Sequence, residues 1–282
     1  MRAIKVCIRS VLGQLKRLSL MRSRYQFAKS YFTPRLRSLR RWVFCNREVT
    51  NFTYDLTDLN KQQLAYFCAH ITGCSLQEIE GYIDEIASDQ VLRQFVLKQY
   101  ALSHFWYSAE SYCEFGRRIG WYALIRATKP ALVVETGVDK GLGSVVIAVA
   151  LLKNKAEGRP GEYVGIDINP HAGYLFQKPY TEVGKIVYAD AIDTLNHMTG
   201  PIDFFISDSD HCVQYEYNEY KAIDSKLSSQ ALIVADNAHC SDSLMRYARD
   251  VNKAFLFFSE SPKDHWYPGG GIGVAFSQQQ SP

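Results

Sequence analysis

The sequence lacks the patterns that define several large classes of protein. Its seven cysteines are odd in number and scattered, and no C-x-x-C pair occurs. This usage argues against a zinc site and a disulfide framework, and it favours a reducing compartment. No apolar run approaches the roughly 20 residues that a membrane span needs, and charges interrupt every apolar stretch, so we expect neither a span nor a secretory signal. We therefore expect a cytoplasmic protein, and we expect no nucleic-acid partner.

Acidic residues are almost missing from residues 1–48, a basic arm. The arm carries 13 Lys or Arg and one acid, a net of +12, whereas the rest of the chain carries 19 basic and 28 acidic residues, a net of −9. A basic amphipathic helix is typical of a segment that lies on an anionic membrane surface. An organelle transit segment, a loosely ordered extension and a helix packed on its own domain are alternatives. One helical face of the arm carries Ile4, Ile8, Val11, Leu15 and Leu18.

Two further regions follow the arm. Residues 49–128 have helical patterns, including a capping box of Ser75 and Glu78 ahead of an apolar stripe. In residues 129–282, apolar β-type runs alternate with helical segments, which predicts an α/β fold with a doubly wound, mostly parallel sheet. The last two runs have no helix between them and predict a terminal antiparallel hairpin. The expected helices of this region are 143–154, 191–198, 213–227 and 239–252.

Five of the apolar runs end in an acidic residue. The runs lack the alternating polar face of a solvated strand, so they suit central parallel strands that are buried on both sides. Ligands bind outside the carboxyl ends of the strands in open parallel sheets. These acids therefore predict a ligand site at one edge of the sheet. The runs are ALVVE ending at Glu135, EYVGID at Asp167, KIVYAD at Asp190, DFFISD at Asp208 and ALIVAD at Asp236.

A glycine-rich loop follows the first of these strands. Its spacing is G-x-x-x-G-x-G, whereas a dinucleotide fingerprint needs G-x-G-x-x-G and a P-loop needs Lys and then Ser or Thr after its last glycine. The acid-x-Gly start, with another Gly four residues on, resembles motif I of class I S-adenosylmethionine-dependent methyltransferases. Asp139 stands where that motif has its middle glycine, and glycines that serve only the turn are the alternative. The resemblance implies a cofactor-binding role for Glu135, Gly137, Gly141 and Gly143.

Two later acids match further cofactor elements. A carboxylate at the position of Asp167 can accept both hydroxyls of a ribose, although a helix N-cap is the alternative role. The segment Ala189-Asp190-Ala191 resembles the G-D-A element that lies beside the adenine in the same family. The resemblance implies cofactor contacts for Asp190 and Ala191, and Asp190 would equally serve as the N-cap of the next helix.

The fourth and fifth acid-ended strands give the most specific signal. If the two strands are neighbours, their backbones lie about 4.8 Å apart, and carboxylate oxygens can converge on Mg²⁺ or Ca²⁺. The segments D-S-D-H (208–211) and D-N (236–237) resemble the D-x-D and D-N elements of catechol-type and macrocin-type metal-dependent O-methyltransferases. The resemblance implies that Asp208, Asp236 and Asn237 hold the metal. It makes Asp210 the base, with His211 in reserve, and helix capping by the acids is the alternative.

The resemblance covers roughly residues 130–276. It implies a Rossmann-like, seven-stranded sheet and transfer of a methyl group from S-adenosylmethionine to a hydroxyl oxygen, which a divalent metal such as Mg²⁺ would activate. The acceptor is then a small molecule or a sugar, and aromatic residues in 100–122 and 266–267 are candidates for lining its pocket. A homo-oligomer is compatible with the sequence. The competing hypotheses are a nicotinamide-dependent oxidoreductase and a membrane-peripheral, non-catalytic binding protein.

Overall fold

The structure, a computed structural model, describes residues 2–236 and 238–277, with side chains described from Leu12 onward. The chain divides into two compact units. The first contains the residues up to Asn46 together with Asp264–Tyr267, and the second contains Arg47–Lys263 and the residues from Pro268 onward. The finer division of the second unit at residue 128 stays a prediction.

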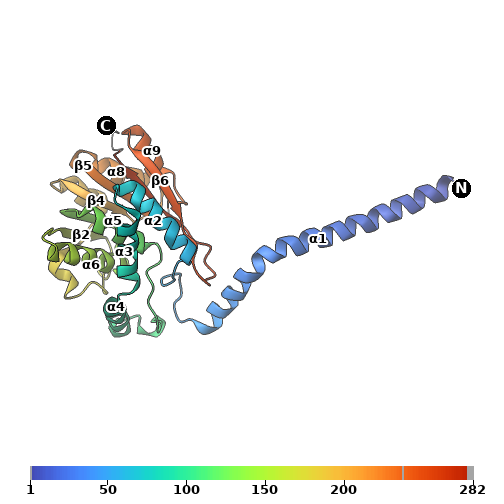
Figure 1. Cartoon of the computed structure of the whole chain (residues 1–282), viewed down its shortest axis with the longest axis horizontal. Coiled ribbons are helices and arrows are strands. Elements are labelled where there is room, and N and C mark those ends of the chain that lie inside the picture. Colours follow the sequence, from blue (N-terminus) through green and yellow to red (C-terminus); the bar gives the residue numbers. More distant parts are fainter. Residues whose placement is uncertain (1, 237, 278–282) are drawn as a thin grey trace. The chain divides into compact units, whose positions relative to one another are not determined.

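The first unit is formed by one long helix, α1 (Arg2–Cys45), and a short loop segment; α1 is blue in Figure 1. The rings of Trp42 and Trp266 pack with their centroids 5.1 Å apart. None of the helices among the described residues is long and apolar enough to cross a membrane. The predicted apolar face of the arm falls partly outside the described side chains, at Ile4, Ile8 and Val11.

The second unit is organised around a seven-stranded sheet with the order β3-β2-β1-β4-β5-β7-β6. Strands β1 to β5 are parallel to one another, and β7 is antiparallel to both β5 and β6. The predicted parallel sheet with a terminal antiparallel hairpin is therefore confirmed. The strands are β1 (Leu132–Thr136), β2 (Glu162–Asp167), β3 (Gly184–Tyr188), β4 (Ile202–Ser207), β5 (Leu227–Asp236), β6 (Ala254–Ser259) and β7 (Gly271–Phe276).

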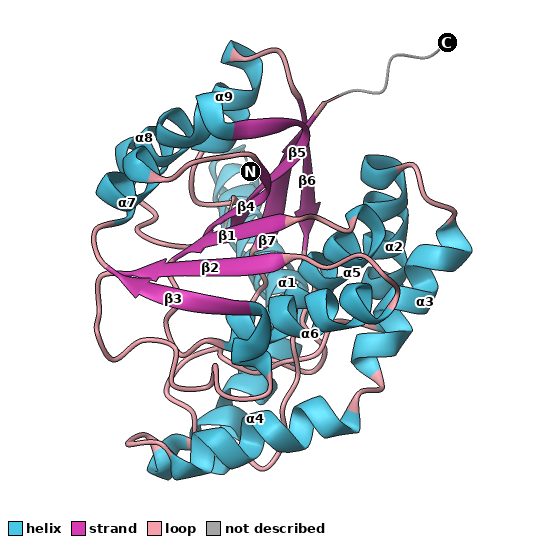
Figure 2. Ribbon diagram, turned by 90° about the vertical axis from the view of Figure 1, so that its left-hand side faces the viewer, coloured by secondary structure: helices cyan, strands magenta, loops and turns pink. Residues whose placement is uncertain are grey.

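Helices cover both faces of this sheet (Figure 2). On one side α5 packs against α2, α3 and α6, and on the other side α7, α8 and α9 pack in succession. The strands are rich in Val, Ile and Phe because both of their faces are covered. The helices are α2 (Asp58–Thr72), α3 (Leu76–Ala87), α4 (Gln90–Leu102), α5 (Arg118–Thr128), α6 (Leu142–Ala156), α7 (Ala191–His197), α8 (Val213–Ile223) and α9 (Ser243–Asp250), with short 3₁₀ turns at Trp106–Ser108, Tyr180–Val183 and Asp224–Lys226.

The order of the strands fixes where a ligand site can form. From β1 the chain moves outward through β2 and β3, and it then returns to place β4 on the other side of β1. The topological switch point therefore lies between the carboxyl ends of β1 and β4, which is where open α/β sheets bind ligands. Strands β4 and β5 are sheet neighbours, which is the condition for Asp208 and Asp236 to lie close together.

Candidate active site

The loop between β1 and α6 lies directly against the segment that follows β4. Gly137 has a φ of 82°, and a Cβ at this position would lie 2.1 Å from the carbonyl oxygen of Asp208. Gly141 has a φ of 91° and caps the N-terminus of α6. Residues that have a side chain rarely adopt such a φ, so the backbone conformation of the turn requires glycine at both positions. They bring the loop backbone to the switch point.

Glu135 lies beneath this loop in a buried polar cluster. The residue is 1% exposed, and its carboxylate accepts hydrogen bonds from Ser144 Oγ, at 2.9 Å, and from the Tyr163 hydroxyl. Burial raises the pKa of Glu135 to about 7, although both hydrogen bonds act in the opposite direction. A Cβ at Gly143 would lie 2.4 Å from Glu135 Oε1, so the third glycine makes room for this carboxylate.

Asp167 and Asp190 are both engaged by backbone amides. Asp167 Oδ2 accepts the N–H groups of Val138 and Asp139 at 2.9 and 3.0 Å, and it thereby holds the glycine loop against the end of β2. Asp190 is the N-cap of α7 and accepts the N–H of Asp193 at 2.9 Å. The ribose role of Asp167 and the adenine role of Asp190 stay predictions.

Two cavities open along the carboxyl ends of β1, β2 and β4. The larger has a volume of about 360 Å³, and the smaller has a volume of about 230 Å³. Asp139 and Asp208 line both cavities, which therefore adjoin. The residues of the larger cavity include Gly137, Asp167, Ala191, Asp210 and Tyr215, and those of the smaller cavity include Arg118, Glu135, Lys140, Gly143 and His211.

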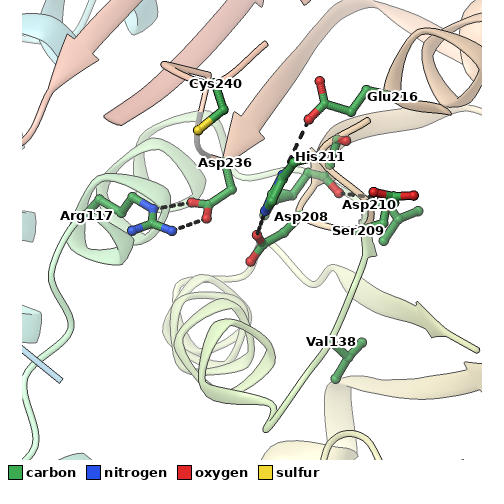
Figure 3. A network of polar contacts seen from close by, with 12 residues as sticks. Arg117, Val138, Asp208, Ser209, Asp210, His211, Glu216, Asp236 and Cys240 are labelled. Carbon is green, nitrogen blue, oxygen red and sulfur yellow. Dashed lines mark hydrogen bonds and ion pairs between the residues drawn. The ribbon is translucent and has the colours of Figure 1, made fainter. Parts of the chain in front are cut away.

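The end of β5 carries a buried ion pair that the sequence did not predict (Figure 3). Arg117 Nε donates to Asp236 Oδ1 at 2.5 Å, and Nη2 donates to Oδ2. The side chains of the pair are 6% and 0% exposed. Burial opposes the ionisation of Asp236, but the Arg117 guanidinium outweighs it and lowers the pKa of this carboxyl. Burial and the neighbouring Asp236 raise the pKa of Asp208 well above its usual range.

These side chains do not fit the predicted divalent metal. Both oxygens of Asp236 already accept hydrogen bonds from a guanidinium, and a second cation beside Arg117 would be repelled. Asn237, the third predicted ligand, lies outside the described residues. Within the described part of the chain, no group of three or more His, Cys, Asp or Glu side chains is placed to hold a metal ion.

The two candidate bases lie on the loop after β4. His211 Nδ1 lies 3.4 Å from Glu216 Oε1, and Nε2 lies 3.9 Å from Asp208 Oδ1, as Figure 3 shows. The hydrogen bond with Glu216 raises the pKa of His211 despite partial burial. Asp210 Oδ1 accepts the N–H of Cys212 at 3.2 Å. His211 borders the smaller cavity and Asp210 the larger.

Comparison with known proteins agrees with this arrangement. Residues 134–238 match a family model described as a methyltransferase domain. These residues form a methyltransferase domain. The predicted resemblance to class I S-adenosylmethionine-dependent methyltransferases is therefore confirmed, and the strand order is consistent with it. No curated protein matches the chain.

Solved methyltransferases are among the similar structures, all at low sequence identity. PaMTH1 of Podospora anserina, bound to SAH, is 17% identical with a TM-score of 0.44; the match covers 57% of this chain and 77% of that one. The O-methyltransferase TomG of Streptomyces achromogenes, in complex with SAM and involved in tomaymycin synthesis, is 15% identical with a TM-score of 0.48; the match covers 68% of this chain and 91% of TomG. A Bacillus cereus O-methyltransferase in complex with SAH is 15% identical with a TM-score of 0.42; the match covers 56% of this chain and 78% of that one.

Sequence reasoning missed the residues that reach the methyltransferase domain from outside it. Arg117 and Arg118 precede the domain, and Glu260 follows it. Arg117 Nη1 donates to Glu260 Oε1 at 3.3 Å and to the Tyr54 hydroxyl at 2.8 Å. Two signals were available: an Arg-Arg pair at the start of a mostly apolar helix, and a sixth apolar run, KAFLFFSE, that also ends in an acid.

Proposed function

We propose that this protein transfers a methyl group from S-adenosylmethionine to a hydroxyl oxygen of a small molecule or a sugar. The two adjoining cavities at the switch point carry the proposal. The larger, beside Gly137, Asp167 and Ala191, suits the adenosine part of the cofactor. The smaller, beside Glu135 and Arg118, suits its amino-acid part and the reacting groups.

Arg118 and Glu135 supply complementary charges for that amino-acid part. Arg118 Nε is buried and has no hydrogen-bond partner within the described structure. A guanidinium is the usual partner of a carboxylate, so Arg118 would bind the cofactor carboxylate. Glu135 would accept the cofactor amino group, since a buried carboxylate needs a positive partner when it ionises.

Methyl transfer at this site is an in-line displacement. A lone pair of the acceptor oxygen attacks the methyl carbon while the carbon–sulfur bond breaks, and its electron pair returns to sulfur to give S-adenosylhomocysteine. Holding the two reactants in line supplies much of the acceleration. The hydroxyl proton passes to His211 Nε2, whose ring borders the smaller cavity and is oriented through Nδ1 by Glu216. Asp210 is the alternative base.

Ligand binding distinguishes a methyltransferase from the competing enzyme class, a nicotinamide-dependent oxidoreductase. We expect S-adenosylhomocysteine to raise the melting temperature by several degrees, because a ligand at about 100 times its dissociation constant stabilises a protein by roughly 2.7 kcal/mol. NADH serves as the matched control. Stabilisation by NADH and not by S-adenosylhomocysteine would identify an oxidoreductase instead. A panel of phenols and sugars, assayed with labelled S-adenosylmethionine, then identifies the acceptor class.

The arm is proposed to hold the enzyme on an anionic membrane surface. Helix α1 has no acidic residue, and two of its described apolar side chains, Leu15 and Leu18, are 56% and 60% exposed. A helix of this kind inserts its apolar side chains among lipids while its basic residues contact anionic headgroups. Flotation with phosphatidylserine vesicles should recover the full-length protein, and Leu15→Glu with Leu18→Glu should abolish recovery. Equal recovery of the two proteins would disprove the anchor.

A further inference from the structure

Arg117 pairs with Asp236 at the end of β5, where the sequence predicted a divalent cation. All three nitrogens of its guanidinium are engaged, by Asp236 on one side and by Tyr54 and Glu260 on the other. Four hydrogen bonds would have to break before this side chain could leave. The guanidinium is therefore a fixed part of the site.

The surrounding structure is shaped to hold Arg117 in place. Gly116 has a φ of 52°, and a Cβ there would lie 2.7 Å from the Tyr54 ring, so only glycine lets this ring pack beside the backbone. The Tyr54 hydroxyl donates to Glu260 Oε2 at 2.8 Å while it accepts from Arg117 Nη1. Glu260 Oε1 also accepts the N–H of Gly270 at 2.7 Å. The ends of β5 and β6 and the start of α5 are thereby tied together.

A divalent cation would compete with this arrangement for the same oxygens. Mg²⁺ requires near-octahedral oxygen ligands at about 2.0–2.1 Å. A guanidinium is always charged and matches a carboxylate with two parallel hydrogen bonds. With both Asp236 oxygens held in this way, Asp208 is the remaining predicted carboxylate ligand in the described structure.

We infer that Arg117 is the permanent cation of this acidic edge, so that the enzyme works without a bound divalent metal. Arg117 is a positioning residue, because it acts through Asp236, whose two carboxylate oxygens it holds. The activity part of this inference rests on the proposed methyl transfer, whereas the metal-binding part does not.

Direct measurement of Mn²⁺ binding by electron paramagnetic resonance tests the inference on the full-length protein. We expect wild type to bind no Mn²⁺ at millimolar concentration, with or without S-adenosylhomocysteine. Arg117→Gln removes the competing charge, and we expect Mn²⁺ binding to appear in this variant and to be lost again when Asp236→Asn is added. Arg117→Lys keeps a cation and should stay metal-free.

A matched control separates the loss of a buried arginine from the opening of the acidic site. Arg126 lies in α5, the helix that Arg117 directly precedes; it is 5% exposed and pairs with Glu85 and Glu157 at 3.0 and 2.6 Å. Arg126→Gln should lower the melting temperature and should not create Mn²⁺ binding. If Arg117→Gln does not fold, wild type and Arg117→Lys still decide the question.

Several outcomes would overturn the inference. They are Mn²⁺ binding by wild type that Asp236→Asn abolishes, a folded Arg117→Gln that binds no Mn²⁺, and methyl transfer that stops with chelator and returns with Mg²⁺. Methyl transfer that persists with chelator supports it. If wild type binds neither S-adenosylhomocysteine nor Mn²⁺, the proposed function fails while the metal-binding part of the inference stands.

Discussion

Lowering the pH from 8 to 6 should weaken the binding of S-adenosylhomocysteine about tenfold, because Glu135 must lose a proton before it accepts the ligand's amino group. In the free protein, burial raises the pKa of Glu135 to about 7. The carboxyl is therefore mostly protonated at pH 6 and mostly ionised at pH 8. An ammonium group beside it restores a pKa near its ordinary value.

The size of the effect follows from these two states. With a free-state pKa of about 7, about 0.9 proton is bound to Glu135 at pH 6 and about 0.1 at pH 8. Binding should release those protons, so the affinity should rise with pH up to about 7 and then level off. In the absence of ligand, the raised pKa of Glu135 makes folding stability fall as the pH rises, whereas ligand affinity increases with pH. The folded state holds its proton more tightly than the unfolded state, so this contribution to stability is lost as the pH rises from about 4.5 to about 7.

Isothermal titration calorimetry in buffers of different ionisation enthalpy measures the released protons directly. Glu135→Gln should remove both the proton release and the pH dependence. Glu219→Gln is a matched control, because burial also raises the pKa of Glu219 to about 7 while Ser207 and Ser209 are its hydrogen-bond partners. 5′-Methylthioadenosine lacks the amino group and should bind without releasing a proton from Glu135. Equal affinity for S-adenosylhomocysteine at pH 6 and 8, with no proton release, would refute the reasoning.

Three further substitutions test the site. Gly137→Ala should lower the free energy of unfolding in urea by about 2–3 kcal/mol, because the added Cβ meets a carbonyl oxygen at a φ of 82°. Gly158→Ala is the control: this glycine has a φ of 79° but nothing within 4 Å, so the substitution should cost only about 1 kcal/mol. Equal losses of stability in the two variants would contradict the close approach of Gly137 to the carbonyl oxygen. Arg118→Gln should weaken S-adenosylhomocysteine roughly 10-fold to 100-fold, as expected for a lost charged hydrogen bond, and should leave 5′-methylthioadenosine unaffected; a parallel loss for both ligands would place Arg118 elsewhere. His211→Asn should lower kcat by about 10²–10⁴ with an unchanged dissociation constant for S-adenosylhomocysteine, and a variant that keeps full kcat would transfer the role of base to Asp210.

The fold was predictable from the sequence because its strands have local signatures. A run such as ALIVAD is apolar throughout and ends in an acid, so both its burial and its carboxyl end can be recognised without knowledge of its neighbours. The structure places Asp167 and Asp236 at the last positions of β2 and β5, and Asp208 directly after β4. The helices α6 and α7 begin and end within two residues of the expected bounds, whereas α8 ends at Ile223 and not at 227, because the chain turns there into a short 3₁₀ segment.

The partners of the acids were not predictable in the same way. Asp236 pairs with Arg117, which precedes it by 119 residues, and Glu260 reaches the same guanidinium from the hairpin beyond the methyltransferase domain. Nothing in a local window tells whether a carboxylate will face a metal, an arginine or water, since tertiary packing decides this. Resemblance to a metal-dependent family supplied the metal ligands in the sequence-based hypothesis, and it contained no information on Arg117.

The negative charge of the carboxylates at this edge of the sheet explains why a guanidinium can take the place of a divalent cation there. Asp236 and Glu260 share Arg117, while burial favours the protonated forms of Glu135 and Asp208. The guanidinium offsets part of the negative charge of the free site, and burial opposes the ionisation of the other two carboxyls. The ammonium group of S-adenosylmethionine can replace the proton on Glu135, so this carboxylate stays paired when the ligand enters. On this reasoning, pH governs the occupancy of the site through Glu135, and Arg117 already supplies the cation that pairs with Asp236.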